Sequence, residues 1–513
     1  ERWGVSEENR VDQLLEAIHQ ARARVYQIGN ATPLEPMVIE GVNQSIWVKR
    51  EDLGPIKAYK WRGAFNAMAC LTPAQLEGGV VAASAGNHAQ GIALAARKLG
   101  TKAYIYMPEP TPLVKRKAVM AHGGDCVSIE LIGDSFAEAQ TAALEHATQT
   151  GASFIPPYDS IDVMAGQGTL ADEIFTSGEG PFDRVYVAVG GGGMASAVAA
   201  LLKSSWPKVK VIGVEGVDQA SMKAAIELGK PVPLDYVDVF CDGTAVTQVG
   251  KLTYALCRDL LDEIVTVTNG EVSSAIKSHW DGLRVIPEPS GAMSLAGFLK
   301  HHAAGEIKPD EKVLTILCGA NMDFAKFADV SRQAGINPQH DRSWRFIIPE
   351  EKGSLARLLT DLPVGVSIMD LQYGRTKNEP QRPLLSVDVP DLAFAEFKKW
   401  IARKEESSED VTGHGATRFR VIPFTPALFA SPLFVEVEFP ERAGALLGFM
   451  NAISSITSLC YFNYAYTGER VGRALIGLDF ENDEELSIHR GKIFEQAGKT
   501  VRAVKEVLID ALF

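Results

Sequence analysis

The 513-residue sequence has few cysteines, no cluster of basic residues and no long apolar run. Its six cysteines are scattered, without a Cys-x-x-Cys pair or a histidine at ligand spacing. This pattern excludes a disulfide framework and a zinc motif and suits a reducing compartment, so we expect no metal site. The formal net charge of −13 excludes an electrostatic grip on nucleic acid or anionic lipid.

No stretch approaches the roughly 20 apolar residues that span a bilayer, and the start, Glu1-Arg2-Trp3, lacks the apolar core of a signal peptide. We therefore expect a soluble cytoplasmic protein, or a plastid or mitochondrial one if a transit peptide was removed. With 46% apolar and 22% charged residues, the composition is that of a globular protein with several domains. The expected partners are small molecules, not nucleic acid or membranes.

From about residue 45 to 320, short apolar runs alternate with amphipathic stretches of helical period. This pattern predicts an α/β fold in which buried parallel strands are joined by crossover helices. The expected strands are 80–83, 103–106, 127–129, 185–189, 209–212 and 313–317. Several end at glycine- or asparagine-containing loops, and open parallel sheets bind ligands beyond the carboxyl ends of their strands.

The C-terminal part contains an internal repeat with an offset of 91 residues. The repeated positions are Pro349-Glu350, Gly353, Leu355 and Tyr373 in one copy and Pro440-Glu441, Gly444, Leu446 and Tyr464 in the other. The first copy is expected to have a strand at 346–348 and a helix at 354–362, and the second a strand at 435–439 and a helix at 445–453. The pattern predicts two βαββαβ ferredoxin-like modules. The acidic run 405–410 is interpreted as a solvated loop.

Lys60 lies near a predicted helix start, between Tyr59 and Trp61. A lone lysine in such a place is usually a solvated surface charge. Here its apolar neighbours would desolvate the ammonium group and lower its pKa, which would allow imine formation with an aldehyde and later service as a base. Arg62 is interpreted as a surface or structural residue without a role in the chemistry.

The segment 84–91 joins a predicted strand to an amphipathic helix, so its amide groups lie at the positive end of a helix dipole. We expect Ser84, Ala85, Gly86 and His88 to hold a substrate carboxylate, and Asn87 to donate a hydrogen bond to a ring oxygen of a cofactor. The alternative is an ordinary Asn/Gly turn with a serine cap.

Four consecutive glycines, Gly190, Gly191, Gly192 and Gly193, join another strand to another helix. So many glycines are entropically unfavourable in a plain turn, and a phosphate group explains them better. A nucleotide pyrophosphate is the rival ligand, but the spacing is not Gly-x-Gly-x-x-Gly. A reactive lysine together with a phosphate loop implies pyridoxal phosphate. Cys318, after the strand 313–317, is either a buried small residue or the partner of the pyridine nitrogen.

The chain resembles the fold-type II pyridoxal-phosphate enzymes, and within them the threonine dehydratase family. The motifs that carry the resemblance run along the chain in order: 31–34, 48–52, the Lys60 segment, 84–91, 156–157, 166–169, the tetraglycine, 288–292, 318–321 and the two Pro-Glu starts. The resemblance implies two parallel-sheet subdomains with the cofactor between them. It also implies a catalytic domain at 1–332 with a small subdomain inserted at about 52–160, a linker at 333–343, and ACT-like modules at 344–424 and 425–513.

The implied reaction is β-elimination from threonine, which yields 2-oxobutanoate and ammonia at the first step of isoleucine biosynthesis. The resemblance gives Lys60 the role of Schiff-base lysine and base. It further implies a homo-oligomer, dimer or tetramer, whose modules bind isoleucine and valine. Tyr373 and Tyr464 would then line module interfaces, with plain core packing as the alternative.

Two positions depart from the pattern. Ala58 stands where relatives usually have serine, and Ala85 stands where serine racemases have the serine that protonates the opposite face. Racemisation is therefore disfavoured. Two alternatives remain: a dehydratase for serine or another β-hydroxy amino acid, and an amino-acid sensor whose catalytic core has degenerated.

Overall fold

The computed structural model describes residues 9–334, 341–348, 358–359, 362–372, 383–404, 408–412, 429–440, 445–453, 456–465 and 471–507. The chain forms two compact units, Glu1–Val330 and Ser331–Phe513. None of the helices in these described ranges combines the length and the apolar character that crossing a bilayer requires.

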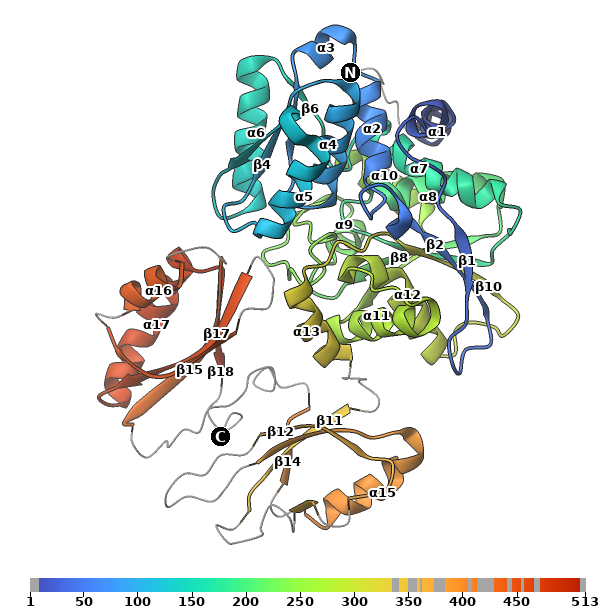
Figure 1. The fold of residues 1–513 in the computed structure, drawn as a ribbon. Coiled ribbons are helices and arrows are strands. Elements are labelled where there is room, and N and C mark those ends of the chain that lie inside the picture. The colour runs from blue at the N-terminus through green and yellow to red at the C-terminus, as the bar shows by residue number, and fades with distance from the viewer. Residues whose placement is uncertain are drawn as a thin grey trace. The chain divides into compact units, whose positions relative to one another are not determined.

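The larger sheet of the first unit has six strands in the order β1-β2-β10-β7-β8-β9. Figure 1 labels β1, β2, β8 and β10 of this sheet. Only β1 is antiparallel to its neighbour; the other pairs are parallel. The strands are β1 (Leu34–Met37), β2 (Ser45–Arg50), β7 (Arg184–Ala188), β8 (Lys210–Gly216), β9 (Glu263–Val267) and β10 (Lys312–Leu317). Strands β7 and β10 are almost wholly buried, because helices cover both faces of the sheet.

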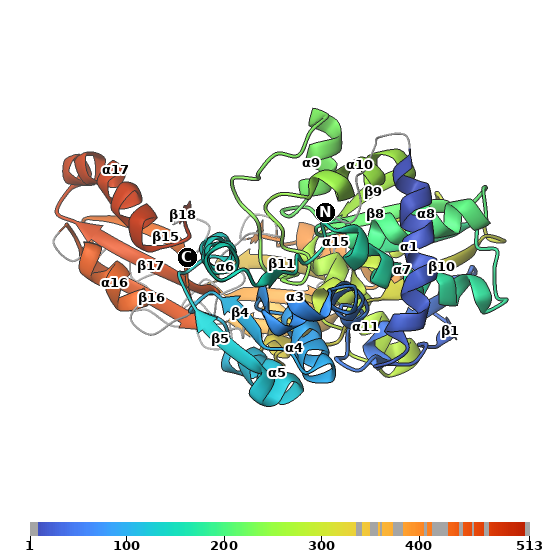
Figure 2. The ribbon, with the colours of Figure 1, turned by 90° about the horizontal axis from the view of Figure 1, so that it is seen from above.

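Helix α12 (Pro289–Ala303) packs against β7, β8, β9 and β10, and α11 (Asn269–Leu283) packs on α12. The other face carries α7 (Ile161–Thr176) and α8 (Gly193–Ser205), and Figure 2 shows α1 (Arg10–Val25) beside these two helices. The remaining helices of this part are α9 (Ser221–Leu228), α10 (Lys251–Leu260) and α13 (Phe324–Ala334).

The smaller sheet of the first unit is parallel throughout, with the order β5-β4-β3-β6. Its strands are β3 (Val80–Ala83), β4 (Ala103–Met107), β5 (Val127–Leu131) and β6 (Ser153–Phe154). Helix α6 (Phe136–Thr150) packs on β3 and β4, while α2 (Trp61–Ala69), α4 (Asn87–Leu99) and α5 (Leu113–Gly123) pack together; α3 (Pro73–Glu77) is a short helix before β3. The predicted pair of parallel-sheet subdomains is confirmed.

The second unit contains two antiparallel sheets with the same topology, β12-β13-β11-β14 and β16-β17-β15-β18. The first has β11 (Asp341–Phe346), β12 (Ser367–Gln372), β13 (Leu384–Asp388) and β14 (Ser408–Asp410), with α15 (Asp391–Ala402). The second has β15 (Ser431–Pro440), β16 (Ser458–Ala465), β17 (Val471–Phe480) and β18 (Ala503–Val507), with α16 (Ala445–Ile453) and α17 (Asp483–Thr500). In each sheet the first strand of the module pairs with the third and the fourth, which confirms the ferredoxin-like prediction.

Three details differ from expectation. Strand β11 ends at Phe346, where the predicted strand began, and α13 runs to Ala334, so both ends of the predicted linker at 333–343 lie in regular structure. Part of the predicted acidic loop, Ser408–Asp410, is an edge strand that pairs with β11. The repeat positions Pro349, Glu350, Gly353, Leu355 and Tyr373 lie outside the described residues.

Candidate active site

The segment that carries Lys60 is paired with the chain that follows β10. Ala58 forms an isolated antiparallel bridge with Gly319. On either side of this bridge the main chain is hydrogen-bonded from Tyr59 N to Cys318 O at 3.0 Å and from Ala320 N to Lys57 O at 2.9 Å. Two of the predicted site segments, far apart in sequence, are thus held side by side by the backbone.

Lys60 is partly buried and lies directly before α2. Its Nζ donates a hydrogen bond to the carbonyl oxygen of Pro157 at 2.8 Å and lies 5.5 Å from the centre of the Tyr59 ring. Burial lowers the pKa of Lys60 to about 8, as the sequence predicts. A neutral amine is therefore accessible near physiological pH.

Cys318 is 4% exposed, and its Sγ donates a hydrogen bond to the carbonyl oxygen of Ser290 at 3.4 Å. Burial, together with the negative charge of Glu288, raises the pKa of the thiol well above its usual range. The side chain is consequently an uncharged thiol at the end of β10.

The loop after β3 leads into α4 through Ser84, Ala85 and Gly86, and the main-chain NH of Gly86 donates to Ser84 Oγ at 3.2 Å. Asn87, the first residue of α4, reaches across to the larger sheet. Its Nδ2 donates to Glu288 Oε1 at 2.6 Å, and its Oδ1 accepts from Asn321 Nδ2 at 2.8 Å. The loop thus lies against the chain that surrounds Lys60 and Cys318.

His88 is buried, and its Nε2 forms a 3.1 Å hydrogen bond with the carbonyl oxygen of Ile155. Burial and the charge of Lys60 lower the pKa of the imidazole to about 3, so the ring is neutral. Its Nδ1 is also buried and has no hydrogen-bond partner within the described part of the chain. The imidazole is packed near the end of β6, and binding of substrate by His88 stays a prediction.

The tetraglycine lies between β7 and α8. Gly192 has a φ of 89° at the helix start, a conformation that favours glycine. A Cβ atom on Gly191 would lie 2.2 Å from the Tyr158 ring, and one on Gly190 would lie 2.9 Å from Thr244 Cα. Side chains therefore cannot be accommodated, while the first amide groups of α8 have no acceptor within the helix. This is the geometry of an anion cradle.

Glu288 was not among the predicted site residues. It is 4% exposed and lies at the start of α12, where Pro289 opens the helix. Burial and the charge of Asp242 raise its pKa to about 7, although the hydrogen bond from Asn87 opposes the change. The sequence signal was a glutamate before a helix-opening proline, which by itself indicates only a helix start.

The comparisons with known proteins agree with this geometry. The profile of the pyridoxal-phosphate dependent enzyme family matches residues 25–319, and that of the C-terminal regulatory domain of threonine dehydratase matches residues 431–503. The biosynthetic L-threonine dehydratase of Haemophilus influenzae is 35% identical over 491 residues, 93% of each chain. That of Escherichia coli is 37% identical over 472 residues, 90% of each chain. The chain belongs to the biosynthetic threonine dehydratase family.

Solved structures of this family and its neighbours support the assignment. The processed threonine deaminase isoform 2 of tomato is 41% identical, with a TM-score of 0.61, and the match covers 64% of this chain and 89% of that one. Maize serine racemase is 28% identical, with a TM-score of 0.57, and the match covers 63% of this chain and 98% of that one.

The site residues fit pyridoxal phosphate, on which this enzyme family depends. The bare loop before α8 has the shape for a phosphate group, and the low pKa of Lys60 suits reaction with an aldehyde. The uncharged Cys318 thiol suits an unprotonated pyridine nitrogen.

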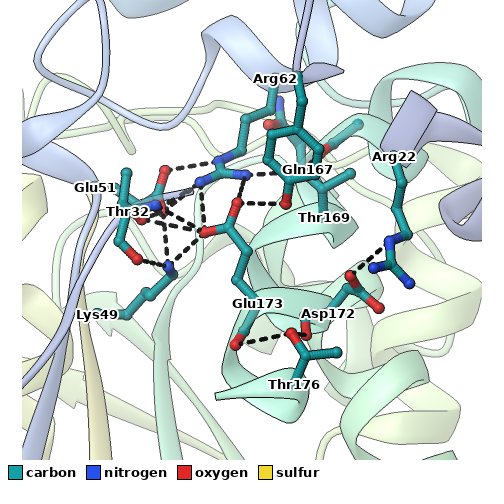
Figure 3. Close-up of polar contacts among 12 residues, drawn as sticks. Arg22, Thr32, Lys49, Glu51, Arg62, Gln167, Thr169, Asp172, Glu173 and Thr176 are labelled. Carbon is teal, nitrogen blue, oxygen red and sulfur yellow. Dashed lines mark hydrogen bonds and ion pairs between the residues drawn. The ribbon is translucent and has the colours of Figure 1, made fainter. Parts of the chain in front are cut away.

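A buried ion cluster holds the start of α2, as Figure 3 shows. Arg62 is fully buried, which rules out the surface interpretation. Its guanidinium group donates to both oxygens of Glu51 at 2.8 and 3.0 Å and to both oxygens of Glu173 at 2.6 and 2.9 Å. Lys49 Nζ donates to Glu173 Oε2 and to the carbonyl oxygen of Thr32, each at 2.5 Å. We call Thr32, Lys49, Glu51, Arg62 and Glu173 the Arg62 cluster.

The Arg62 cluster joins β2 and the turn after it to α2 and α7. Because Lys60 directly precedes α2, this cluster fixes the backbone that presents the lysine. No local sequence pattern indicates this pairing, since Arg62 and Glu173 are 111 residues apart.

Of the two predicted regulatory residues, Tyr373 lies outside the described residues. Tyr464, on β16, is partly buried against the core of its module, with its ring centre 5.7 Å from that of Phe439. This contact favours the core-packing alternative for Tyr464, and a place at an interface stays a prediction.

Proposed function

We propose that this chain converts L-threonine to 2-oxobutanoate and ammonia, the first step of isoleucine biosynthesis, with pyridoxal phosphate as cofactor. The observation that carries the proposal is the partly buried Lys60 with a pKa of about 8, held beside Cys318 and close to the Asn87 loop. It occurs in a chain whose full-length relatives are named biosynthetic threonine dehydratases.

Each group then has a defined task. When bound, pyridoxal phosphate supplies the electron sink that stabilises negative charge at the substrate Cα. Lys60 Nζ takes the proton from that carbon, which its low pKa permits near neutral pH. The amides of Gly190 to Gly193 bind the phosphate, and Ser84 with the amides of Ala85 and Gly86 orients the substrate carboxylate. Cys318 stays protonated and would meet the ring nitrogen as an uncharged thiol.

The first test is the identity of the reactive lysine. Borohydride reduction followed by peptide mass mapping is expected to label Lys60, and Lys60→Ala is expected to lower 2-oxobutanoate formation at least about 10³-fold. Lys277→Ala is the control, because Lys277 lies in an exposed ion pair with Asp281. Labelling of another lysine, or an active Lys60→Ala variant, would overturn the assignment.

The second test concerns the substrate. Ala58 is fully buried against Gly319, so the hydroxyl group of a serine at that position is missing beside Lys60. We expect kcat/KM for threonine to exceed that for serine. A preference for serine would favour the alternative dehydratase, and absence of both activities would favour the sensor.

We further propose that isoleucine and valine act through the C-terminal modules and that the enzyme is a homo-oligomer. The support is the regulatory-domain match over residues 431–503. Activity measured with and without isoleucine, together with light scattering, tests both points. A cytoplasmic location, or one in an organelle, stays a prediction from the sequence.

A further inference from the structure

A line of hydrogen bonds runs from the main chain of Ile56 through two asparagine side chains to Glu288. Asn321 Nδ2 donates to the carbonyl oxygen of Ile56 at 2.7 Å and to Asn87 Oδ1 at 2.8 Å. Asn87 Nδ2 then donates to Glu288 Oε1 at 2.6 Å. We call Ile56, Asn87, Glu288 and Asn321 the Asn87 clamp.

The carbonyl group of Ile56 sets the direction of the hydrogen bonds along the Asn87 clamp, from donor to acceptor. A main-chain carbonyl can only accept hydrogen bonds, so Asn321 must turn its NH₂ group toward Ile56. The second hydrogen of that group points to Asn87, which must therefore present its oxygen there. The NH₂ group of Asn87 is left to face Glu288, whose Oε1 accepts its hydrogen bond.

This arrangement selects one of the two orientations of the Asn87 amide. A flipped amide would place Asn87 Oδ1 against the Glu288 carboxyl group and Nδ2 against the NH₂ group of Asn321, so two partly buried hydrogen bonds would be lost. Glu288 uses only one of the two hydrogens on Asn87 Nδ2, so the other remains available for a ligand.

We propose that Asn321 and Glu288 are positioning residues that lock the side-chain amide of Asn87 so that it offers a hydrogen, never an oxygen, to the ring oxygen of the cofactor. The inference rests on the proposed function, in which Asn87 binds that oxygen. A ring oxygen that carries negative charge would be attracted by Nδ2–H and repelled by Oδ1, so the orientation decides whether Asn87 strengthens or weakens cofactor binding.

The decisive variant is Asn321→Asp, which keeps the shape but removes the donor. Asn87 should then turn its NH₂ group toward the new carboxylate and its oxygen toward the ligand. We expect pyridoxal phosphate to bind about ten- to a hundred-fold more weakly, with a shifted visible absorbance maximum. The melting temperature of the cofactor-free protein should fall, because Glu288 would face Asn87 Oδ1.

A second change separates orientation from simple damage to the fold. In Asn321→Asp/Glu288→Gln, the new glutamine can donate to the flipped Asn87 oxygen, so the melting temperature should recover while weak cofactor binding and the shifted absorbance persist. Glu288→Gln alone keeps Asn321 as the donor to Asn87 Oδ1, so it should bind pyridoxal phosphate more tightly than Asn321→Asp does. If Asn321→Asp alone did not fold, the double variant, in which the unfavourable contact at Glu288 is relieved, would carry the test of cofactor binding.

The matched control is Glu311→Gln, which removes a carboxylate that pairs with Arg184 just before β10, whereas the Asn87 clamp lies beyond its other end. It should leave the absorbance and the cofactor affinity unchanged. Unchanged cofactor binding in Asn321→Asp, or recovery of both properties in the double variant, would overturn the inference. Failure of the wild-type protein to bind pyridoxal phosphate through Lys60 would instead refute the proposed function.

Discussion

The Arg62 cluster is buried and the Asn87 clamp is partly buried, and both lie beside the segment that carries Lys60, yet their carboxyl groups ionise differently. In the cluster, burial alone would lower the pKa of Arg62 and raise that of Glu173, but their mutual attraction prevails and keeps both ionised. In the clamp, the Glu288 side chain is hydrogen-bonded to the neutral amide of Asn87, and burial raises the pKa of Glu288 to about 7. An opposite charge in contact, not depth of burial, decides the ionisation state.

Lys49 marks the limit of this rule. It contacts Glu173, but burial outweighs the attraction of Glu51 and Glu173 and lowers its pKa. The pKa of Arg62 is not lowered, because its planar guanidinium group forms two hydrogen bonds with each of the two carboxylates. The cluster is thus suited to holding the backbone, whereas Lys60 and Glu288, whose pKa values move toward neutral pH, lie where chemistry is proposed.

The largest effect should come from breaking the charge balance of the Arg62 cluster. Glu173→Gln leaves Arg62 and Lys49 buried with Glu51 as their remaining carboxylate, so the free energy of unfolding should fall by about 3–5 kcal/mol. Denaturant titration at pH 8 measures it. The exposed pair of Lys277 and Asp281 is the control, and Asp281→Asn should change stability by less than about 1 kcal/mol. Equal losses of stability in Glu173→Gln and Asp281→Asn would contradict the expected difference between a buried and an exposed ion pair.

The pH dependence of Glu288 should have the sign opposite to that of Glu173. Because the folded pKa of Glu288 is raised from its ordinary value of 4.5 to about 7, the folded state holds its proton longer, and stability should fall by about 3 kcal/mol as pH rises through this window. The folded pKa of Glu173 is lowered, so its contribution is present above the ordinary value and is lost as pH falls below it. Unfolding curves of Glu288→Gln between pH 4.5 and 8 should lack the decline due to Glu288. A decline equal to that of the wild type would contradict the assignment.

The smallest effect is expected in the glycine loop, Gly190 to Gly193, which has no ionisable side chain. Gly191→Ala should destabilise the protein by about 1–3 kcal/mol and weaken pyridoxal phosphate binding, because its Cβ would overlap the Tyr158 ring. Gly448 lies on the exposed side of α16, where an added Cβ would meet no atom of another element within 4 Å. Gly448→Ala should therefore stabilise the protein by about 0.5–1 kcal/mol. Thermal unfolding and cofactor titration distinguish the two. Tight cofactor binding by Gly191→Ala would argue against a phosphate in this loop.

Much of the fold follows from local sequence. The strand at 80–83 and the helix at 445–453 have the predicted bounds, because apolar runs and helical periodicity are properties of neighbouring residues. The sequence does not predict strands β1, β2, β6 and β9. β6 has only two residues, and β1 contains a proline and a glutamate, so neither displays an apolar run.

The site was predictable where one segment contains the whole signal. The glycine loop and the 84–91 loop each join a strand to a helix, and the sequence places both at the ends of buried strands. Glu288 and Asn321 stand out in the sequence only as parts of family motifs, because their partner, Asn87, lies 201 and 234 residues away. No local pattern records such a contact.

The sequence by itself determined which segments are strands, helices and bare loops, that the C-terminal module is repeated, and which lysine has the setting for imine chemistry. Tertiary structure alone decided which carboxylate meets which cation, which way the Asn87 amide faces, and that Arg62 is an internal anchor. The physical reason is range: backbone propensity and hydrophobic periodicity act between neighbours, whereas ionisation and amide orientation depend on groups brought together only when the sheets pack.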